Sequence, residues 1–325
     1  MDEQTTKILE LYNNTKINKT KIIKKSKDRD YSLAELTVLS CIDAIVRYDQ
    51  CNGNGFEWDL NKVLRMIILS SIDSDTLASL KKGKQYQALV DEFVENRTNE
   101  SEMAGISLRM SSCNYRDDDP VINEFNKNFG SLHNVIRQGH IYWAAKGERL
   151  ESDLEHTYGT LLLAIGIESE YDYAIDFNKV LETLTVHEAD EIIMGDPTEW
   201  DLSGEERLLQ STNAINFVFR NFKNKDKYIR NLDNFNNAKN APDIESEYEH
   251  LIDKLEYLLQ VKTYQDQKRY DFKHRPDNVV TRSERVRQII ENGAQDVFEV
   301  HYEYDKDRFT RFPCLRRILE QSKKM

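Results

Sequence analysis

The stretch HEADEIIMGD, residues 187–196, places a histidine and several carboxylates at helical spacing and then interrupts the helix. His187 and Glu188 are adjacent, so on one helix they project about 100° apart and can approach one metal ion from two sides. Glu191 lies four residues after His187, one turn further along the same face. The following Gly-Asp-Pro ends the helix and leaves Asp196 beside any adjoining cavity. Alone, such a stretch is more typical of a solvated helix face than of a metal site.

Two further segments supply residues of the same kind. ESDLEH, residues 151–156, brings His156 directly before a strongly apolar run. HLIDKLEYLL, residues 250–259, places Asp253 inside an apolar helix, where an ionised carboxylate is unfavourable unless a cation or a donor accompanies it. The neighbouring Lys254 is one such partner, and a metal ion is the other. The three segments together favour a metal site.

Apolar residues recur at helical spacing through most of the chain, which predicts an all-α fold. The low content of glycine (12) and proline (5) agrees with long helices. Period-two alternation appears only at 297–304, where we expect a short strand or hairpin. Composition predicts loops at CNGNG (51–55), RDDDP (116–120), GDPTEWDLSGE (195–205) and NLDNFNNAKNAPD (231–243).

The two halves of the chain share a pattern around the tetrapeptide NKVL, at 61–64 and again at 178–181. In that register the front half lacks every candidate ligand, with Leu36 opposite His156, and Ser70 and Ser71 opposite His187 and Glu188. We interpret the front half as a degenerate repeat of the same helical fold, with a structural role in shaping the rear pocket or an oligomer contact. A coincidence between two amphipathic helices is the alternative.

The length of 325 residues exceeds what one hydrophobic core usually supports, so we expect two domains. The expected division is a helical N-terminal domain, residues 1–120, and a second domain, residues 121–325, with the boundary in the segment 111–124.

Composition also limits the partners. A net charge of −12 disfavours duplex nucleic acid, which needs a basic surface to displace condensed counterions. The longest apolar stretches are far shorter than the roughly 20 residues of a spanning helix, so no membrane partner is expected. The four cysteines are scattered and the opening residues contain no secretory apolar region, which predicts a cytoplasmic protein. A homodimer remains open.

Four segments in this order resemble the HD-domain phosphohydrolases, particularly the branch of bacterial 5′-deoxynucleotidases. The segments are LHNVIRQGH (132–140), ESDLEH (151–156), HEADEIIMGD (187–196) and HLIDKLEYLLQ (250–260). The resemblance covers about residues 129–265. It implies that the second domain is an HD-type helical bundle with a C-terminal helical extension.

The resemblance implies a role for each candidate residue. One divalent metal ion would be held by His156, His187, Glu188 and Asp253. Glu191 matches the catalytic glutamate that acts on the attacking water, and Asp196 matches an aspartate near the sugar and the scissile phosphate. Arg137 matches the arginine that contacts phosphate. His140 stands where the family usually has an aromatic residue that contacts substrate, and Lys254 offers a further cationic contact.

One departure concerns the doublet that names the family, which is His-Asp there and His187-Glu188 here. Glutamate keeps the charge and the oxygen donors but adds a methylene, so we expect a changed coordination geometry or metal preference; loss of the metal is the alternative. A mixed set of imidazoles and carboxylates suits Mn²⁺ or Co²⁺, with Zn²⁺ or Mg²⁺ as further candidates.

The implied function is a metal-dependent phosphohydrolase acting on a small-molecule nucleotide, most simply hydrolysis of a deoxynucleoside 5′-monophosphate to nucleoside and phosphate. Two alternatives stay open: release of triphosphate from a deoxynucleoside triphosphate, and a nucleotide-binding sensor or scaffold with weakened catalysis. Glu191 favours an enzyme, because a pure binding pocket has no need of a positioned base.

Overall fold

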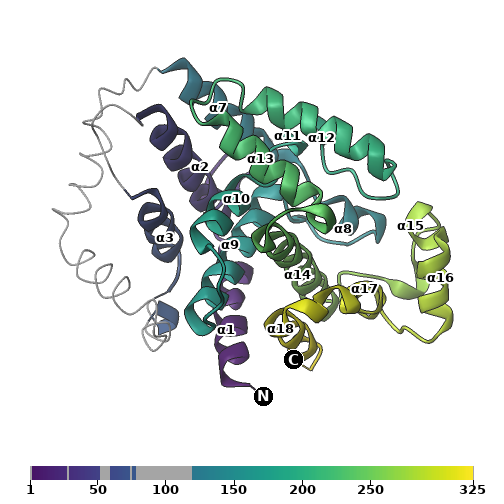
Figure 1. Ribbon diagram of the computed structural model, residues 1–325. Coiled ribbons are helices and arrows are strands. Elements are labelled where there is room, and N and C mark those ends of the chain that lie inside the picture. Colours follow the sequence, from purple (N-terminus) through teal and green to yellow (C-terminus); the bar gives the residue numbers. More distant parts are fainter. Residues whose placement is uncertain (1, 28, 52–58, 74, 78–118, 325) are drawn as a thin grey trace.

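The structure is a computed structural model that describes residues 2–27, 29–51, 59–73, 75–77 and 119–324 (Figure 1). Most of the predicted CNGNG and RDDDP loops lies outside these residues, as does most of the predicted boundary segment.

The described residues form an all-α bundle with one two-stranded hairpin, so the predicted fold class is confirmed. The first part contains α1 (Glu3–Asn18), β1 (Ile22–Lys24), β2 (Tyr31–Ser32), α2 (Leu33–Cys51) and α3 (Leu60–Ser70). The middle contains α7 (Pro120–Gly130), α8 (Gln138–Tyr142), α9 (Asp153–Glu170), α10 (Phe177–Val186), α11 (Glu191–Met194), α12 (Gly204–Val218) and α13 (Lys225–Asn236). The last part contains α14 (Ile244–Asp266), α15 (Val279–Arg282), α16 (Glu284–Glu291), α17 (Val297–Asp305) and α18 (Pro313–Ser322).

Helix α9 is the centre of the bundle. It begins at a capping box in which Ser152 Oγ accepts from the Glu155 amide and the Glu155 side chain accepts from the Ser152 amide. Nearly all of its residues are buried, and residues 161–167 are apolar on all sides, as expected for a helix enclosed by others. Helices α1, α2, α10 and α14 pack around it (Figure 1).

The N-terminal helices share one hydrophobic core with the rest of the described chain. Helices α1 and α2 pack on α9, and α3 packs on α10. The two NKVL tetrapeptides lie in the first turns of α3 and α10, which begin after the capping residues Asp59 and Asp176. The degenerate repeat and the division near residue 120 stay predictions.

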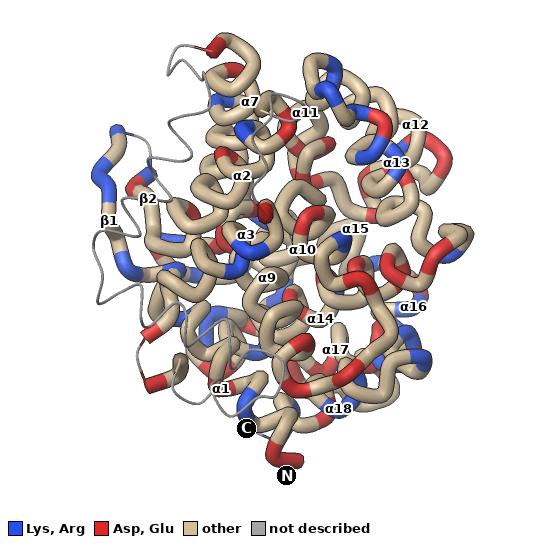
Figure 2. The backbone as a smooth tube through the Cα atoms, turned by 60° about the vertical axis from the view of Figure 1, so that its left-hand side comes forward, with Lys and Arg blue, Asp and Glu red and all other residues tan. Residues whose placement is uncertain are grey.

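The chain ends lie close together because α18 packs on α1 (Figure 1). Gln321 Nε2 donates to Thr6 Oγ1 over 2.8 Å, which joins the last described helix to the first. The hairpin lies at the periphery, where residues 20–27 are exposed and the lysines of β1 and its flanks form a basic edge (Figure 2).

Two local expectations were wrong. The segment 297–304 forms helix α17 instead of a strand, because its buried residues Val297, Phe298, Val300 and His301 share one helical face. The predicted loop at 231–243 is helical as far as Asn236, because Leu232 and Phe235 pack into the core as the last turns of α13.

Candidate metal centre

The four candidate metal ligands come together in the fold. His156 lies on α9, His187 and Glu188 follow α10, and Asp253 lies on α14. One ligand atom from each lies within 4.8 Å of all the others, and all four side chains are buried. His156 Nε2 lies 2.8 Å from Asp253 Oδ1 and 3.5 Å from Glu188 Oε1, and His187 Nε2 lies 3.2 Å from the same glutamate oxygen.

The orientation of both imidazoles fits a metal ion. His187 Nδ1 donates to the Leu184 carbonyl over 2.7 Å, so its Nε2 faces the cluster, where it has no hydrogen-bond partner. His156 Nδ1 lies 2.5 Å from Glu256 Oε2, so its Nε2 also faces the cluster. A second hydrogen bond from the remote ring nitrogen is the usual support of a histidine ligand.

The charge of the His156 imidazole depends on the carboxylates around it. Burial and Arg137 oppose the charged form of His156, but Glu256 and Asp253 outweigh them and raise the pKa of its imidazole to about 10. A metal ion must therefore displace the Nε2 proton before this nitrogen can bind it.

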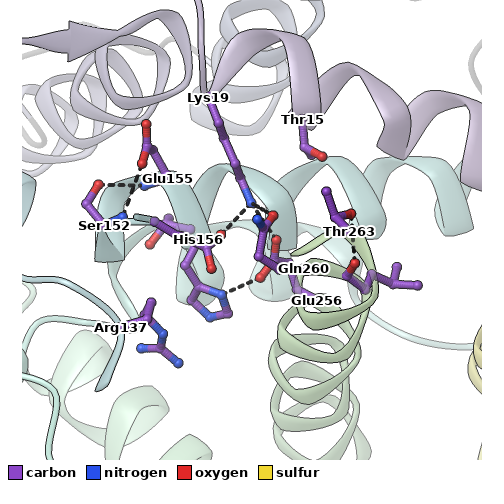
Figure 3. A network of polar contacts seen from close by, with 12 residues as sticks. Thr15, Lys19, Arg137, Ser152, Glu155, His156, Glu256, Gln260 and Thr263 are labelled. Atoms are coloured by element: carbon purple, nitrogen blue, oxygen red, sulfur yellow. Dashed lines mark hydrogen bonds and ion pairs between the residues drawn. The ribbon is translucent and has the colours of Figure 1, made fainter. Parts of the chain in front are cut away.

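Arg137 places its guanidinium among the carboxylates, and it lies across the His156 ring from Glu256 (Figure 3). Its Nη1 lies 2.9 Å from Glu188 Oε1 and 3.3 Å from Asp196 Oδ1. Burial opposes the charge, but Asp196 and Glu188 raise the pKa of the guanidinium well above its ordinary value. Arg137 is therefore a permanent cation beside the candidate ligands.

Glu191 lies at the start of α11, beside the Arg137 guanidinium. Its Oε2 is 3.7 Å from Arg137 Nη1 and accepts no hydrogen bond. Burial, followed by the charges of Asp196 and Glu188, raises the pKa of Glu191 well above its ordinary value. The raised pKa means that this carboxylate binds a proton more readily than an exposed glutamate does.

Asp153 is a member of this cluster that the sequence did not single out. It is fully buried, and its Oδ1 lies 3.5 Å from Arg137 Nη1. Burial and then the charges of Glu188 and Asp196 raise its pKa well above the ordinary value. The sequence signal was ambiguous, because an aspartate in the first turn of a helix is already explained by the helix dipole.

A cavity of about 330 Å³ opens onto the cluster. Arg137, Glu188, Glu191, Asp196 and Asp253 line it on one side. The rest of its wall includes the aromatic and cationic residues Trp143, Trp200, Tyr304, Lys254, Arg207 and Arg308. Lys254 Nζ lies 3.1 Å from Asp253 Oδ2, so the lysine pairs with a candidate ligand and also faces the cavity.

His140 has a different place from the one expected of a substrate contact. Its side chain is fully buried, between Glu151 Oε2 at 3.1 Å and the Tyr270 hydroxyl at 2.8 Å. The preceding residue, Gly139, lines the cavity and His140 does not. The ring points into the bundle because its two polar partners, Glu151 and Tyr270, are buried there.

Two other histidines line the cavity, and the sequence assigned neither a role there. Burial lowers the pKa of both His250 and His301 to about 3, so both imidazoles are neutral. His250 lies one turn before Lys254 on α14, and this spacing was a usable signal. His301 comes from α17, and only the packing of α17 on α14 brings it to the cavity.

The structure thus combines a helical bundle with a buried set of two imidazoles and two carboxylates that could hold a metal ion. Comparison with protein-family models matches the HD domain over residues 129–293, about half of the chain. The chain belongs to the HD-domain family, whose members are generally metal-dependent phosphohydrolases, and its buried cluster can hold one divalent ion. Searches of curated proteins and of solved structures returned no match.

Proposed function

We propose that this HD-domain protein hydrolyses the phosphate ester of a nucleotide, most simply a deoxynucleoside 5′-monophosphate, in the manner of the 5′-deoxynucleotidases. The observation that carries the proposal is the position of Arg137 and Glu191 beside the four candidate metal ligands, at the wall of one cavity. A permanent cation, a proton acceptor and a metal site are the three groups that phosphomonoester hydrolysis requires.

His156, His187, Glu188 and Asp253 would hold the metal ion. When bound, the ion supplies a water molecule of lowered pKa and neutralises charge on the phosphate. Arg137 binds phosphoryl oxygens through the planar fork of its guanidinium. Glu191 takes the proton of the attacking water as the new phosphorus–oxygen bond forms. The proton that Glu191 has taken up then passes through Asp196 to the leaving sugar oxygen as the old bond breaks, or Asp196 holds the sugar hydroxyl.

The remainder of the cavity supports a nucleotide as the substrate. The rings of Trp200 and Tyr304 lie 6.1 Å apart at the cavity wall and offer flat apolar surface to a base. The side chains of Lys254, Arg207 and Arg308 add positive charge around the same space. These three cations also favour the second candidate, release of triphosphate from a deoxynucleoside triphosphate, because that product needs more neutralisation.

The test is a screen of Mn²⁺, Co²⁺, Zn²⁺ and Mg²⁺ against deoxynucleoside and ribonucleoside mono- and triphosphates, with phosphate and triphosphate separated by ion exchange. We expect phosphate release from a monophosphate, and about 100-fold or more loss of kcat in Glu191→Gln. Glu199→Gln is the matched control, because Glu199 lines the same cavity but accepts from the Tyr304 hydroxyl over 2.6 Å.

The screen separates the alternatives. Triphosphate as the product would identify the second candidate. Metal binding with no hydrolysis of any nucleotide would contradict the enzyme and leave the nucleotide-binding sensor or scaffold.

The expected setting is also part of the proposal. No helix in the part of the chain that the structure describes is long and apolar enough to cross a membrane. We place the protein in the cytoplasm with a small-molecule nucleotide as its partner, and not duplex nucleic acid, on the strength of its cysteine spacing and its net charge of −12. Light scattering, which measures the mass of the protein in solution, tests whether it forms a homodimer.

A further inference from the structure

Glu256 is a buried carboxylate that connects the metal site to the N-terminal helix. It lies three residues after Asp253 on α14 and is fully buried. Its Oε2 lies 2.5 Å from His156 Nδ1, on the ring edge opposite the metal-facing nitrogen. Its Oε1 accepts from Lys19 Nζ over 2.8 Å (Figure 3). The same oxygen accepts from the Tyr12 hydroxyl over 2.7 Å. Both donors come from α1 or its C-terminal cap.

Lys19 is buried, and every donor of its ammonium group is used. Nζ contacts Glu256 Oε1 at 2.8 Å, Glu151 Oε1 at 2.5 Å and Gln260 Oε1 at 3.1 Å. An ammonium group has three N–H bonds, so these three acceptors satisfy it completely. Two buried carboxylates converge on this one cation, and a buried lysine is rare unless it is paired in this way.

We propose that Lys19 is a positioning residue of the metal site, which holds the Glu256 carboxylate against His156 Nδ1 and thereby fixes the tautomer and direction of that imidazole. The ring then presents Nε2 to the cluster with its lone pair available. The inference rests on the metal site within the proposed function and is independent of the substrate. It makes the N-terminal segment a part of that site.

The packing of α9 on α14 leaves a slot for the Glu256 carboxylate. Gly159 lies on α9, and a Cβ built there would come within 2.1 Å of Glu256 Oε1. A larger residue would drive the carboxylate out of its place between Lys19 and His156. The absence of a side chain at residue 159 therefore leaves room for the carboxylate between Lys19 and His156.

Lys19 also reaches the segment that carries Arg137. Lys19 contacts one carboxylate oxygen of Glu151, Oε1. The other oxygen, Oε2, lies 3.1 Å from His140 Nε2. The Glu151 carbonyl accepts from the Arg137 amide over 3.1 Å. Lys19 therefore supports the candidate metal ligand His156 through Glu256. It also contacts Glu151, whose backbone carbonyl binds the amide of Arg137.

The test measures the Mn²⁺ dissociation constant of metal-free protein by calorimetry, beside its thermal unfolding. In the charge-balanced double variant Lys19→Met with Glu151→Gln we expect Mn²⁺ to bind about 10- to 100-fold more weakly, the usual effect of removing an outer support of a metal ligand. The matched control is Asn18→Ala. Asn18 donates to the Ser71 carbonyl and the Tyr158 hydroxyl, so its loss should lower the unfolding temperature and leave the dissociation constant within twofold.

Two further variants keep the proposal testable if the double variant does not fold. Tyr12→Phe removes one donor to Glu256 and should weaken Mn²⁺ binding roughly fivefold. Gly159→Ala should weaken it by displacing the carboxylate. A dissociation constant within twofold of the wild type in every variant that folds would overturn the role of Lys19.

The wild type separates this inference from the proposed function. Mn²⁺ binding without hydrolysis of any nucleotide contradicts the proposed function alone. Absence of Mn²⁺ binding overturns both.

Discussion

Arg137 Nη1 lies 2.9 Å from Glu188 Oε1, so the candidate phosphate-binding cation is in direct contact with a candidate metal ligand. The pairing balances charge in a cluster that contains more carboxylates than cations. The guanidinium therefore lies next to the site where the four candidate ligands would hold a metal ion. We therefore expect substitutions of Arg137 to affect mainly phosphate binding, and substitutions of Glu188 to affect mainly metal binding.

Arg137→Lys should lower kcat/KM for a phosphomonoester by about 10- to 100-fold, because lysine keeps the charge but lacks the planar fork. The Mn²⁺ dissociation constant should change much less, since the charge beside Glu188 remains. Steady-state kinetics and calorimetry measure the two effects. Arg316→Lys is the control, because Arg316 is exposed on α18 and pairs with Glu320 over 2.9 Å; an equal loss in both variants would contradict the role given to Arg137.

Glu188→Gln should weaken Mn²⁺ binding by about 100-fold or more, because it removes a ligand charge from the cluster. Glu188→Asp should retain binding, since it restores the doublet of the family, and should alter the order of preference among Mn²⁺, Co²⁺ and Zn²⁺. Calorimetric titration with each metal tests both variants. Unchanged affinity in Glu188→Gln would remove Glu188 from the ligand set.

Glu249 should make the protein less stable as the pH rises. Burial raises the pKa of this carboxyl from its ordinary value of 4.5 to about 8, although the charge of Lys179 opposes the increase. The folded state therefore binds the proton of Glu249 more tightly than the unfolded state does. The stabilisation that this proton gives is complete below pH 4.5 and is lost between pH 4.5 and pH 8. Glu249→Gln should remove that loss.

Thermal unfolding of Glu249→Gln and wild type at pH 5 and pH 8 measures the difference. We expect the variant to gain stability at pH 8, on the order of a few kcal/mol, and little at pH 5. Glu291→Gln, on the exposed surface of α16, is the control and should show no such dependence. A gain of equal size at both pH values would argue against a protonated Glu249.

Ser152→Ala should lower the free energy of unfolding by about 2 kcal/mol, because Ser152 both caps α9 and donates to the buried Glu35 Oε1 over 2.7 Å. Ser203→Ala removes an equivalent capping box from α12, whose members are exposed, and should cost about 1 kcal/mol. Denaturant titration of both variants compares them. Equal losses would mean that the bond to Glu35 contributes nothing beyond the cap.

Much of the site could be predicted because its residues lie in short segments with helical spacing. His187, Glu188 and Glu191 lie within five residues of one another, and the apolar surroundings of Asp253 indicated a cation nearby. The single helix expected across them was wrong, because residues 187–190 form a turn between α10 and α11, but so short a segment still keeps the three side chains close together. The convergence of His156 and Asp253 on the same point was a prediction from resemblance, and the fold brings them to within 2.8 Å.

The sequence by itself determined the all-α class and the segments that carry the candidate metal ligands, because apolar periodicity and capping residues act over a few positions along the chain. Tertiary structure alone decided that Asp153 joins the acidic cluster, that His140 faces the interior, and that Lys19 reaches Glu256 across 237 positions. Those outcomes depend on which helices pack side by side, and packing is decided by the complementarity of whole surfaces that no local pattern records.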